Sequence, residues 1–263
     1  MLIRLNPNTL ALRQSAPDSR DYLYRRSNET LKPNVDLRQY DSLVESQLDL
    51  GSCVGNAITN CYELQVKQLY LDTFVDLSRL FVYYNARLLD GTIDTDVGTT
   101  IRSGIRAGNH FGLCTEDLWP YDIAKFSTRP TPECYRDGST RTITQYQSLA
   151  GLEDIIDCLN SGNPAVIGTH LYESFMSLDK DNPIVVFPGH DDQYIGAHAM
   201  VILGYDLNTK QLLAKNSFGV DWGENGYCYI PFYYAQKEFF ERWMFQITDP
   251  GLRVITEITK NQK

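Results

Sequence analysis

The sequence contains no Cys-x-x-Cys pair and no cluster of lysine and arginine. Without closely spaced cysteines the ligand pattern of a structural zinc site is missing, so no metal is expected. The 24 lysines and arginines are outnumbered by 33 aspartates and glutamates, which gives a formal net charge of −9. An acidic chain without a basic patch favours neither nucleic acid nor an anionic membrane as a partner.

Long apolar runs are also absent. No stretch reaches the length of a transmembrane helix, and residues 1–7 lack the charged start and sustained apolar segment of a secretory signal. We therefore expect a cytoplasmic or virion-associated protein whose cysteines are mostly reduced. Cys61 and Cys158 fall on apolar faces of expected helices, whereas Cys114 and Cys134 bracket a loop-rich stretch and could pair in an oxidising compartment.

The chain is long enough for one large domain or two subdomains, with 263 residues of which 43% are hydrophobic. Residues 1–34 are polar and turn-rich, which indicates an N-terminal arm and not a domain. The body, residues 35–263, divides into a helical half at about 48–145 and a strand-rich half at about 146–250. The strand-rich half is expected to form a barrel.

Hydrophobic periodicity predicts several elements of the body. Helices are expected after Cys53, over residues 78–89, from residue 99 or 100 to 107, and over residues 152–159, and a strand over residues 165–171. Ser78 should cap the second helix, whose buried face would carry Leu80, Phe81, Tyr84 and Leu88. Gly108 should end the third helix.

Cys53 stands at the start of a helical pattern, in the sequence Gly51-Ser52-Cys53. Backbone N–H groups and the positive end of the helix dipole favour an anion there, so the thiol is biased towards the nucleophilic thiolate. Gly51 lets the backbone approach closely, and Ser52 is a plausible cap. The alternative is that Cys53 is an ordinary buried cysteine.

A nucleophilic cysteine needs a base and a group that orients the base. His198 opens an apolar strand, and Asn216 ends the next one, so the two side chains can meet across a hairpin. The amide oxygen of Asn216 could then fix the imidazole tautomer. His170 is the main rival base but lacks such a partner, and His190, in a loop near His198 in sequence, could line the cleft.

These residues resemble the papain family of cysteine peptidases. Gln47 lies six residues before Cys53, and Asn216-Ser217-Phe218-Gly219 followed by Trp222-Gly223-Glu224-Asn225-Gly226-Tyr227 is similar to the family's blocks around its asparagine. Further segments resemble a divergent branch found mainly in bacteria and viruses, so most of the chain is covered. The resemblance implies an α+β, two-lobed fold with a helical left half, an antiparallel β-barrel right half and the active site in the cleft between them.

The resemblance also implies roles for individual residues. Cys53 would attack a peptide carbonyl and form a thioester acyl-enzyme, with His198 moving the proton and Asn216 holding His198. The Gln47 amide and the Cys53 N–H would bind the oxyanion, and no cofactor is required. Substrate would contact four residues, namely Gly98, Ala197, Gly51 and Ser52. Glu238 and Glu241 could reach the floor of the main pocket if the C-terminal fold brings them there.

Three residues depart from the family pattern: Leu50 replaces a disulfide cysteine found in many relatives, Val54 replaces an aromatic residue, and Phe218 replaces a tryptophan over the triad. None of these changes removes a catalytic group.

Other readings of the chain stay open. The arm could be a short inhibitory propeptide that crosses the cleft and makes the protein a zymogen, or it could pack on the back of the fold. The protein could also be a papain-fold binding or scaffold protein without catalysis, although no triad residue is lost. An acyltransferase or cell-wall amidase is a third reading, but such enzymes generally lack the Gln47 and Asn-Ser-x-Gly features.

Overall fold

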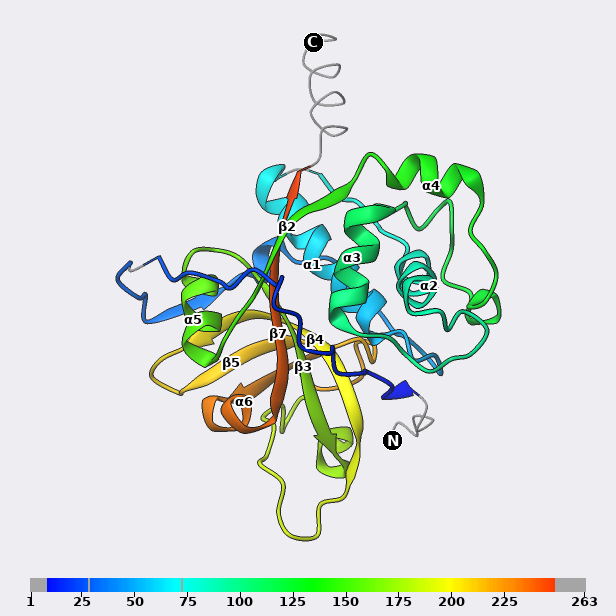
Figure 1. Ribbon diagram of the computed structural model, residues 1–263. Coiled ribbons are helices and arrows are strands. Elements are labelled where there is room, and N and C mark those ends of the chain that lie inside the picture. Colours follow the sequence, from blue (N-terminus) through cyan, green and yellow to red (C-terminus); the bar gives the residue numbers. More distant parts are fainter. Residues whose placement is uncertain (1–8, 28, 72, 249–263) are drawn as a thin grey trace.

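The computed structural model of the chain describes residues 9–27, 29–71 and 73–248, and these residues form two lobes (Figure 1). One lobe contains four helices, α1 (Cys53–Leu69), α2 (Arg79–Asp90), α3 (Ile101–His110) and α4 (Pro132–Gly138). The other is built on a sheet whose strands pair antiparallel throughout. The expected mixed α+β class is confirmed. Residues 249–263, which we assigned to the body, and residues 1–8 of the arm lie outside the described residues.

The sheet has the strand order β2-β7-β3-β4-β5-β6, with β1 paired to β4. These strands are β1 (Asn34–Asp36), β2 (Thr142–Ser148), β3 (Ala165–Tyr172), β4 (Tyr194–Asp206), β5 (Gln211–Lys215), β6 (Tyr227–Pro231) and β7 (Phe239–Thr248). Between them lie α5 (Leu152–Asn160), α6 (Phe232–Glu238) and three short 3-10 helices, η2 (Arg38–Tyr40), η3 (Ile123–Lys125) and η4 (Glu173–Ser177).

The prediction of a closed barrel was wrong, because β2 and β6 do not pair within the described residues. The outer edge of β6 is occupied by a loop instead. Val185 N donates to Tyr229 O at 2.8 Å, and Tyr229 N donates to Pro183 O at 2.9 Å. A loop that satisfies these edge groups removes the need for closure by another strand.

The expected helices are present. The prediction was wrong for the end of α3 and for one residue of the buried face of α2. Ser78 caps α2 by accepting from Phe81 N at 3.1 Å, and Gly91 ends this helix with a positive φ of 71°. Leu88, expected on its buried face, is exposed. Helix α3 starts after its cap, Thr100, but continues past Gly108 to His110.

Gly108, within α3, lies where the helix packs closely against β2. A Cβ at this position would come within 2.7 Å of the Ile143 side chain on β2, so the missing side chain lets helix and strand approach.

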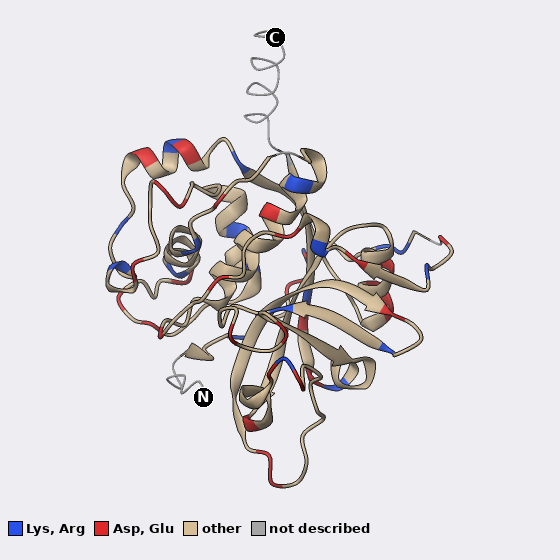
Figure 2. Ribbon diagram, turned by 180° about the vertical axis from the view of Figure 1, so that it is seen from behind, with Lys and Arg blue, Asp and Glu red and all other residues tan. Residues whose placement is uncertain are grey.

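The hydrophobic core runs from the inner face of α1 through the sheet. Cys61 and Cys158 are buried in it, as expected, and all six cysteines are free thiols. None of the described helices is both long and apolar enough to cross a membrane. Lysine and arginine are interspersed with aspartate and glutamate over both lobes (Figure 2).

Candidate active site

Cys53 is the first residue of α1, and its side chain is fully buried. Its sulfur lies against the backbone N–H groups of Ala199, Val54 and Cys53 itself. Burial raises the pKa of this thiol to about 11, although the three N–H groups act in the opposite direction. Ser52 occupies the N-cap position without capping, which corrects the sequence prediction. Its hydroxyl instead contacts the Tyr121 hydroxyl at 2.5 Å.

His198 lies on β4 and Asn216 follows β5, and a hydrogen bond of 2.7 Å joins His198 Nε2 to Asn216 Oδ1. The same Oδ1 accepts from Ser217 N at 2.7 Å. Because a backbone N–H is always a donor, the atom facing it must be the amide oxygen, so His198 Nε2 must carry the proton. The neutral imidazole therefore keeps Nδ1 free as a base, and this buried Nδ1 has no hydrogen-bond partner in the described part of the chain.

Aromatic rings cover the His198–Asn216 bond. The Phe218 ring centroid is 4.8 Å from that of His198, and Trp222 packs edge-on against Phe218 at 5.7 Å. Both aromatic side chains are buried. Phe218 thus shields the hydrogen bond from water even though it replaces the tryptophan that the resemblance led us to expect.

Gln47 links the two lobes beside Cys53. Its backbone N–H donates to Ser217 O at 2.9 Å, and its Oε1 accepts from Ser217 Oγ at 2.6 Å. These contacts fix the amide, so that Nε2 faces two carbonyl oxygens, those of Leu50 and Thr9, each at 3.0 Å. Thr9 belongs to the N-terminal arm. A backbone carbonyl oxygen of the arm therefore accepts a hydrogen bond from the amide that was expected to bind an oxyanion.

The described part of the arm runs between the two lobes, beside β3 and β4 (Figure 1). Ala11 forms a parallel bridge with Ala197, in which Leu12 N donates to Ala197 O and Ala197 N donates to Leu10 O, both at 3.2 Å. On the other side, a Cβ on Gly98 would lie only 1.7 Å from Ala11 O, so glycine permits this approach. The expectation that the arm packs on the back of the fold does not fit these contacts.

Further along, the arm is attached to both lobes by charged and polar side chains. Arg13 pairs with Asp90, and Asp21 pairs with Arg102. On α5, buried Asp157 accepts from Tyr24 Oη at 2.8 Å and from Ser27 N at 2.9 Å. Arg26 pairs with the neighbouring Asp154 at 2.7 Å.

Burial keeps both Cys53 and His198 neutral. It lowers the pKa of His198 to about 4, opposed by the hydrogen bond to Asn216, while the pKa of Cys53 is about 11. Between these values the pair is a thiol and a neutral imidazole, since the charged forms would be buried without enough compensation.

Of the four expected substrate-contacting residues, two lie against the arm. Gly98 and Ala197 contact the arm directly, as described above. Gly51 and Ser52 line the turn before Cys53 and are both buried, with Gly51 N donating to the Asp96 carboxylate at 3.1 Å.

Two glutamates were expected to reach the floor of the main pocket only if the fold allowed it. Glu241 does lie beside the arm. A Cβ at position 168, where the chain has glycine, would lie 3.2 Å from Glu241 Cβ and 2.7 Å from Leu12 Cδ2 of the arm. Glu238 instead bonds to Tyr172 Oη at 3.1 Å and contacts His170 Nδ1 at 3.4 Å.

The other histidines are not part of this group. His170 pairs with Glu238 as described above, His190 is fully exposed, and His110 ends α3. No group of three or more His, Cys, Asp or Glu residues suited to a metal ion occurs within the described ranges.

Sequence reasoning missed the side chains that support the site. The Tyr121 hydroxyl donates to Gln47 O at 2.8 Å and also contacts Ser52. Asp96 and Thr9 were not singled out. An aromatic or an acidic residue in a loop gives no signal of this kind, because the contacts join segments far apart in the sequence.

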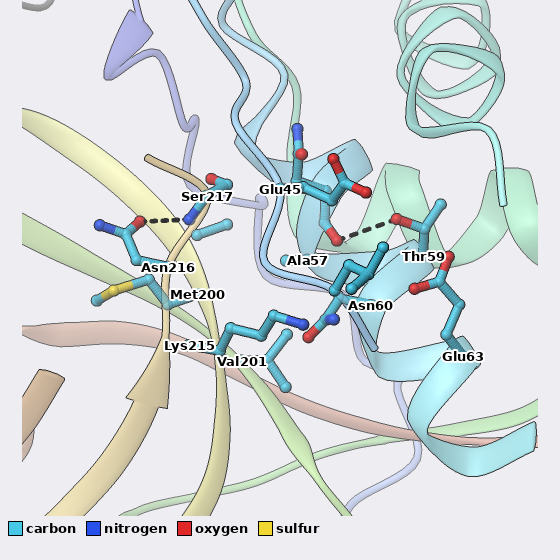
Figure 3. A pocket seen from close by; sticks show the side chains of 13 residues that line it. Glu45, Ala57, Thr59, Asn60, Glu63, Met200, Val201, Lys215, Asn216 and Ser217 are labelled. Carbon is cyan, nitrogen blue, oxygen red and sulfur yellow. Dashed lines mark hydrogen bonds between the residues drawn. The ribbon is translucent and has the colours of Figure 1, made fainter. Parts of the chain in front are cut away.

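A buried ion pair lies behind Asn216. Lys215 lines a cavity between β5 and α1, and its Nζ contacts Asp41 Oδ1 at 3.0 Å. Asp41 also accepts from Tyr227 Oη at 2.8 Å. Figure 3 shows Lys215 extended towards Asn60 of α1, with Asn216 and Ser217 on the opposite side of the cavity. Burial lowers the pKa of Lys215, and Asp41 counteracts this effect.

Comparison with known proteins gives consistent matches. A family model described as papain family cysteine protease matches residues 31–237. A peptidase C1-like protein of Acanthamoeba polyphaga mimivirus is 37% identical over 270 residues, covering 90% of this chain and 86% of that protein. Cathepsin 7 of Mus musculus is 25% identical over 79% of this chain and 63% of its own length.

Solved structures agree with these matches. Xylellain, a cysteine protease from Xylella fastidiosa, has a TM-score of 0.83 at 28% identity and covers 94% of this chain and 98% of its own. Procathepsin B S9 of Trypanosoma congolense has a TM-score of 0.72 at 13% identity over 92% of this chain, a likeness of fold. The two-lobed fold expected from the resemblance is confirmed, and the chain belongs to the papain family of cysteine proteases.

Proposed function

We propose that this chain hydrolyses peptide bonds with Cys53 as nucleophile, His198 as acid and base, Asn216 as the group that orients His198, and Gln47 as oxyanion donor. The observation that carries the proposal is the Thr9 carbonyl oxygen 3.0 Å from Gln47 Nε2. It supports a site in which a peptide carbonyl can be polarised beside a cysteine at a helix start.

In the proposed reaction the Cys53 proton moves to His198 Nδ1, and the sulfur attacks the carbonyl carbon of a peptide or protein substrate. The oxyanion is bound by Gln47 Nε2 and by the Cys53 N–H. His198 gives its proton to the leaving amine as the C–N bond breaks, which leaves a thioester. Water, deprotonated by His198, then attacks the thioester and releases the acid and the thiol.

We further propose that residues 1–34 form an inhibitory arm and residues 35–263 the peptidase domain, so that the chain is made as a zymogen. The contacts of Leu12 and Ala11 with Ala197 and Gly98 support this, because the arm lies where a substrate is expected. The mimivirus relative supports a virion or host-cell setting.

The experiment is intact-mass labelling by a dipeptidyl epoxide under reducing conditions, on the full-length chain and on a chain lacking residues 1–30. We expect an adduct on the shortened chain and little on the full-length one. Cys53→Ala should remove both the adduct and peptide turnover without unfolding the protein. An adduct on both wild-type forms would refute inhibition by the arm, and no adduct on either would favour a papain-fold binding protein.

A further inference from the structure

Two segments contact arm residues 9–13 along the edge that faces away from Ala197 of β4. The first is the turn 47–52, whose Leu50 O faces Gln47 Nε2 and which leads into Cys53. The second is the segment 95–99, where Gly98 lies against Ala11 and Thr99 O accepts from Arg13 N at 3.0 Å. The relative position of these two segments decides whether one extended peptide can contact both of them.

The carboxylate of Asp96 joins the two segments. Both of its oxygens accept from Gly51 N, each at 3.1 Å. Asp96 Oδ1 also accepts from the Tyr83 hydroxyl, and the same hydroxyl accepts from Gly98 N at 3.2 Å. The chain of bonds therefore runs from the turn before Cys53, through Asp96 and Tyr83, to Gly98.

Tyr83 is held in place by its packing on α2. It is fully buried on α2 and packs under the Arg87 guanidinium, whose carbon is 4.2 Å from the ring centroid. Arg87 donates to Ile93 O at 2.8 Å and to Thr95 O at 3.1 Å, which holds the loop that carries Asp96. Tyr83 and Arg87 are one helical turn apart, so one face of α2 holds the whole loop.

We propose that Asp96, acting through Gly51 N and Tyr83, is a positioning residue that fixes the turn 47–52 relative to Gly98, so that one extended peptide can contact both segments. Among the described residues it makes no hydrogen bond to the arm or to the Cys53 and His198 side chains, although its charge contributes to the raised pKa of Cys53. This inference deepens the proposed function, since it takes the groove that holds the arm to be the groove that holds substrate.

The arm itself serves as the bound peptide in the test, so the full-length chain can be used. Hydrogen–deuterium exchange of the segment containing residues 9–16 reports how firmly the groove holds it. Asp96→Ala should speed exchange in that segment by about 10-fold or more, since hydrogen bonds to a charged group are lost. Tyr83→Phe should give a smaller increase, because Gly51 N keeps its acceptor.

Two further variants separate geometry from charge. Asp96→Asn keeps an acceptor oxygen for Gly51 N and should leave the exchange of the arm near that of the wild type. Asp94→Ala, in the same loop but exposed, is the matched control and should change nothing.

The proposal is overturned if Asp96→Ala exchanges like Asp94→Ala, or if exchange rises equally throughout the protein, as a general loss of stability would cause. Peptide hydrolysis is measured separately on the same variants. If the wild type hydrolyses no peptide under any condition, the proposed function fails, while the exchange result still decides the role of Asp96. Where the wild type does turn over, Asp96→Ala should raise KM more than it lowers kcat.

Discussion

The side-chain amide of Gln47 donates to the backbone carbonyl oxygen of Thr9, with 3.0 Å between Nε2 and O. One amide thus serves the arm in the closed protein and is proposed to serve the oxyanion during catalysis. Competition between arm and substrate for this donor is a direct consequence. Both functions can be tested by changing Gln47.

Gln47→Ala, in the chain lacking residues 1–30, should lower kcat by about 10²-fold or more, because one oxyanion donor is lost. The rate of thiol alkylation by iodoacetamide should stay close to that of the wild type. Gln39→Ala, an exposed glutamine on η2, is the control for both assays. An unchanged kcat in Gln47→Ala would exclude the oxyanion role.

Docking of the arm should weaken as the pH falls from about 6.5 to about 4. Burial lowers the pKa of His198 to about 4 in the closed protein, whereas an exposed histidine titrates near 6.5. We expect release of the arm to expose His198, so the open state should bind a proton that the closed state rejects, and acid should favour opening. Calorimetric titration of a peptide of residues 9–34 into the shortened chain measures this.

The His198→Gln variant should lose most of that pH dependence and serves as the control. An affinity for the arm peptide that is equal at pH 6.5 and pH 4.5 would contradict the prediction.

Release of the α5 contacts should raise the basal activity of the full-length chain. Burial alone would raise the pKa of Asp157, but hydrogen bonds from Ser27 and Tyr24 outweigh it and lower the pKa. The carboxylate thus stabilises the docked arm at neutral pH, and this stabilisation is lost as pH falls through its lowered pKa.

Asp157→Ala should increase epoxide labelling of the full-length chain at pH 7 several-fold. Glu153→Ala, an exposed acidic residue on the same helix, should have no such effect. If the two variants label at the same rate, these contacts do not hold the arm.

Asn216→Ala should reduce kcat by at least about 10-fold without a comparable change in stability, because His198 Nε2 loses the acceptor that fixes its tautomer. The pH–rate profile of the shortened chain is the appropriate measurement. Asn208→Ala, an exposed turn residue, is the control. A profile identical to that of the wild type would show that the hydrogen bond does not orient the imidazole.

Lys215→Met should destabilise the fold by about 3–5 kcal/mol, because it leaves the buried carboxylate of Asp41 without its ion-pair partner. Urea unfolding at pH 7 measures the loss. The double variant Asp41→Leu with Lys215→Met should recover part of it, since no uncompensated charge remains. If the double variant is less stable than the single one, the pair contributes net stability and the prediction fails.

Local signals predicted where Cys53, His198 and Asn216 lie in the fold. Cys53 begins α1, and the contact between His198 on β4 and Asn216 after β5 followed from the hairpin pattern. The contacts of the supporting residues could not be predicted from local patterns, because Thr9, Asp96 and Tyr121 contact segments far away in the sequence. The prediction that Gly108 ends α3 was wrong for a related reason. The role of Gly108 is close packing on Ile143, whereas the local pattern indicates a helix end.

The fully buried guanidinium of Arg87 has a consequence for motion in this protein. Its charge has no carboxylate partner at ion-pair distance among the described residues and is compensated by backbone carbonyls of the loop 92–95 and by Phe126 O. Detaching that loop would strand a cation in the core, which costs far more than loosening a surface segment. We therefore expect the arm to be displaced while the loop 92–95 stays in place. The loop itself should detach only in global unfolding.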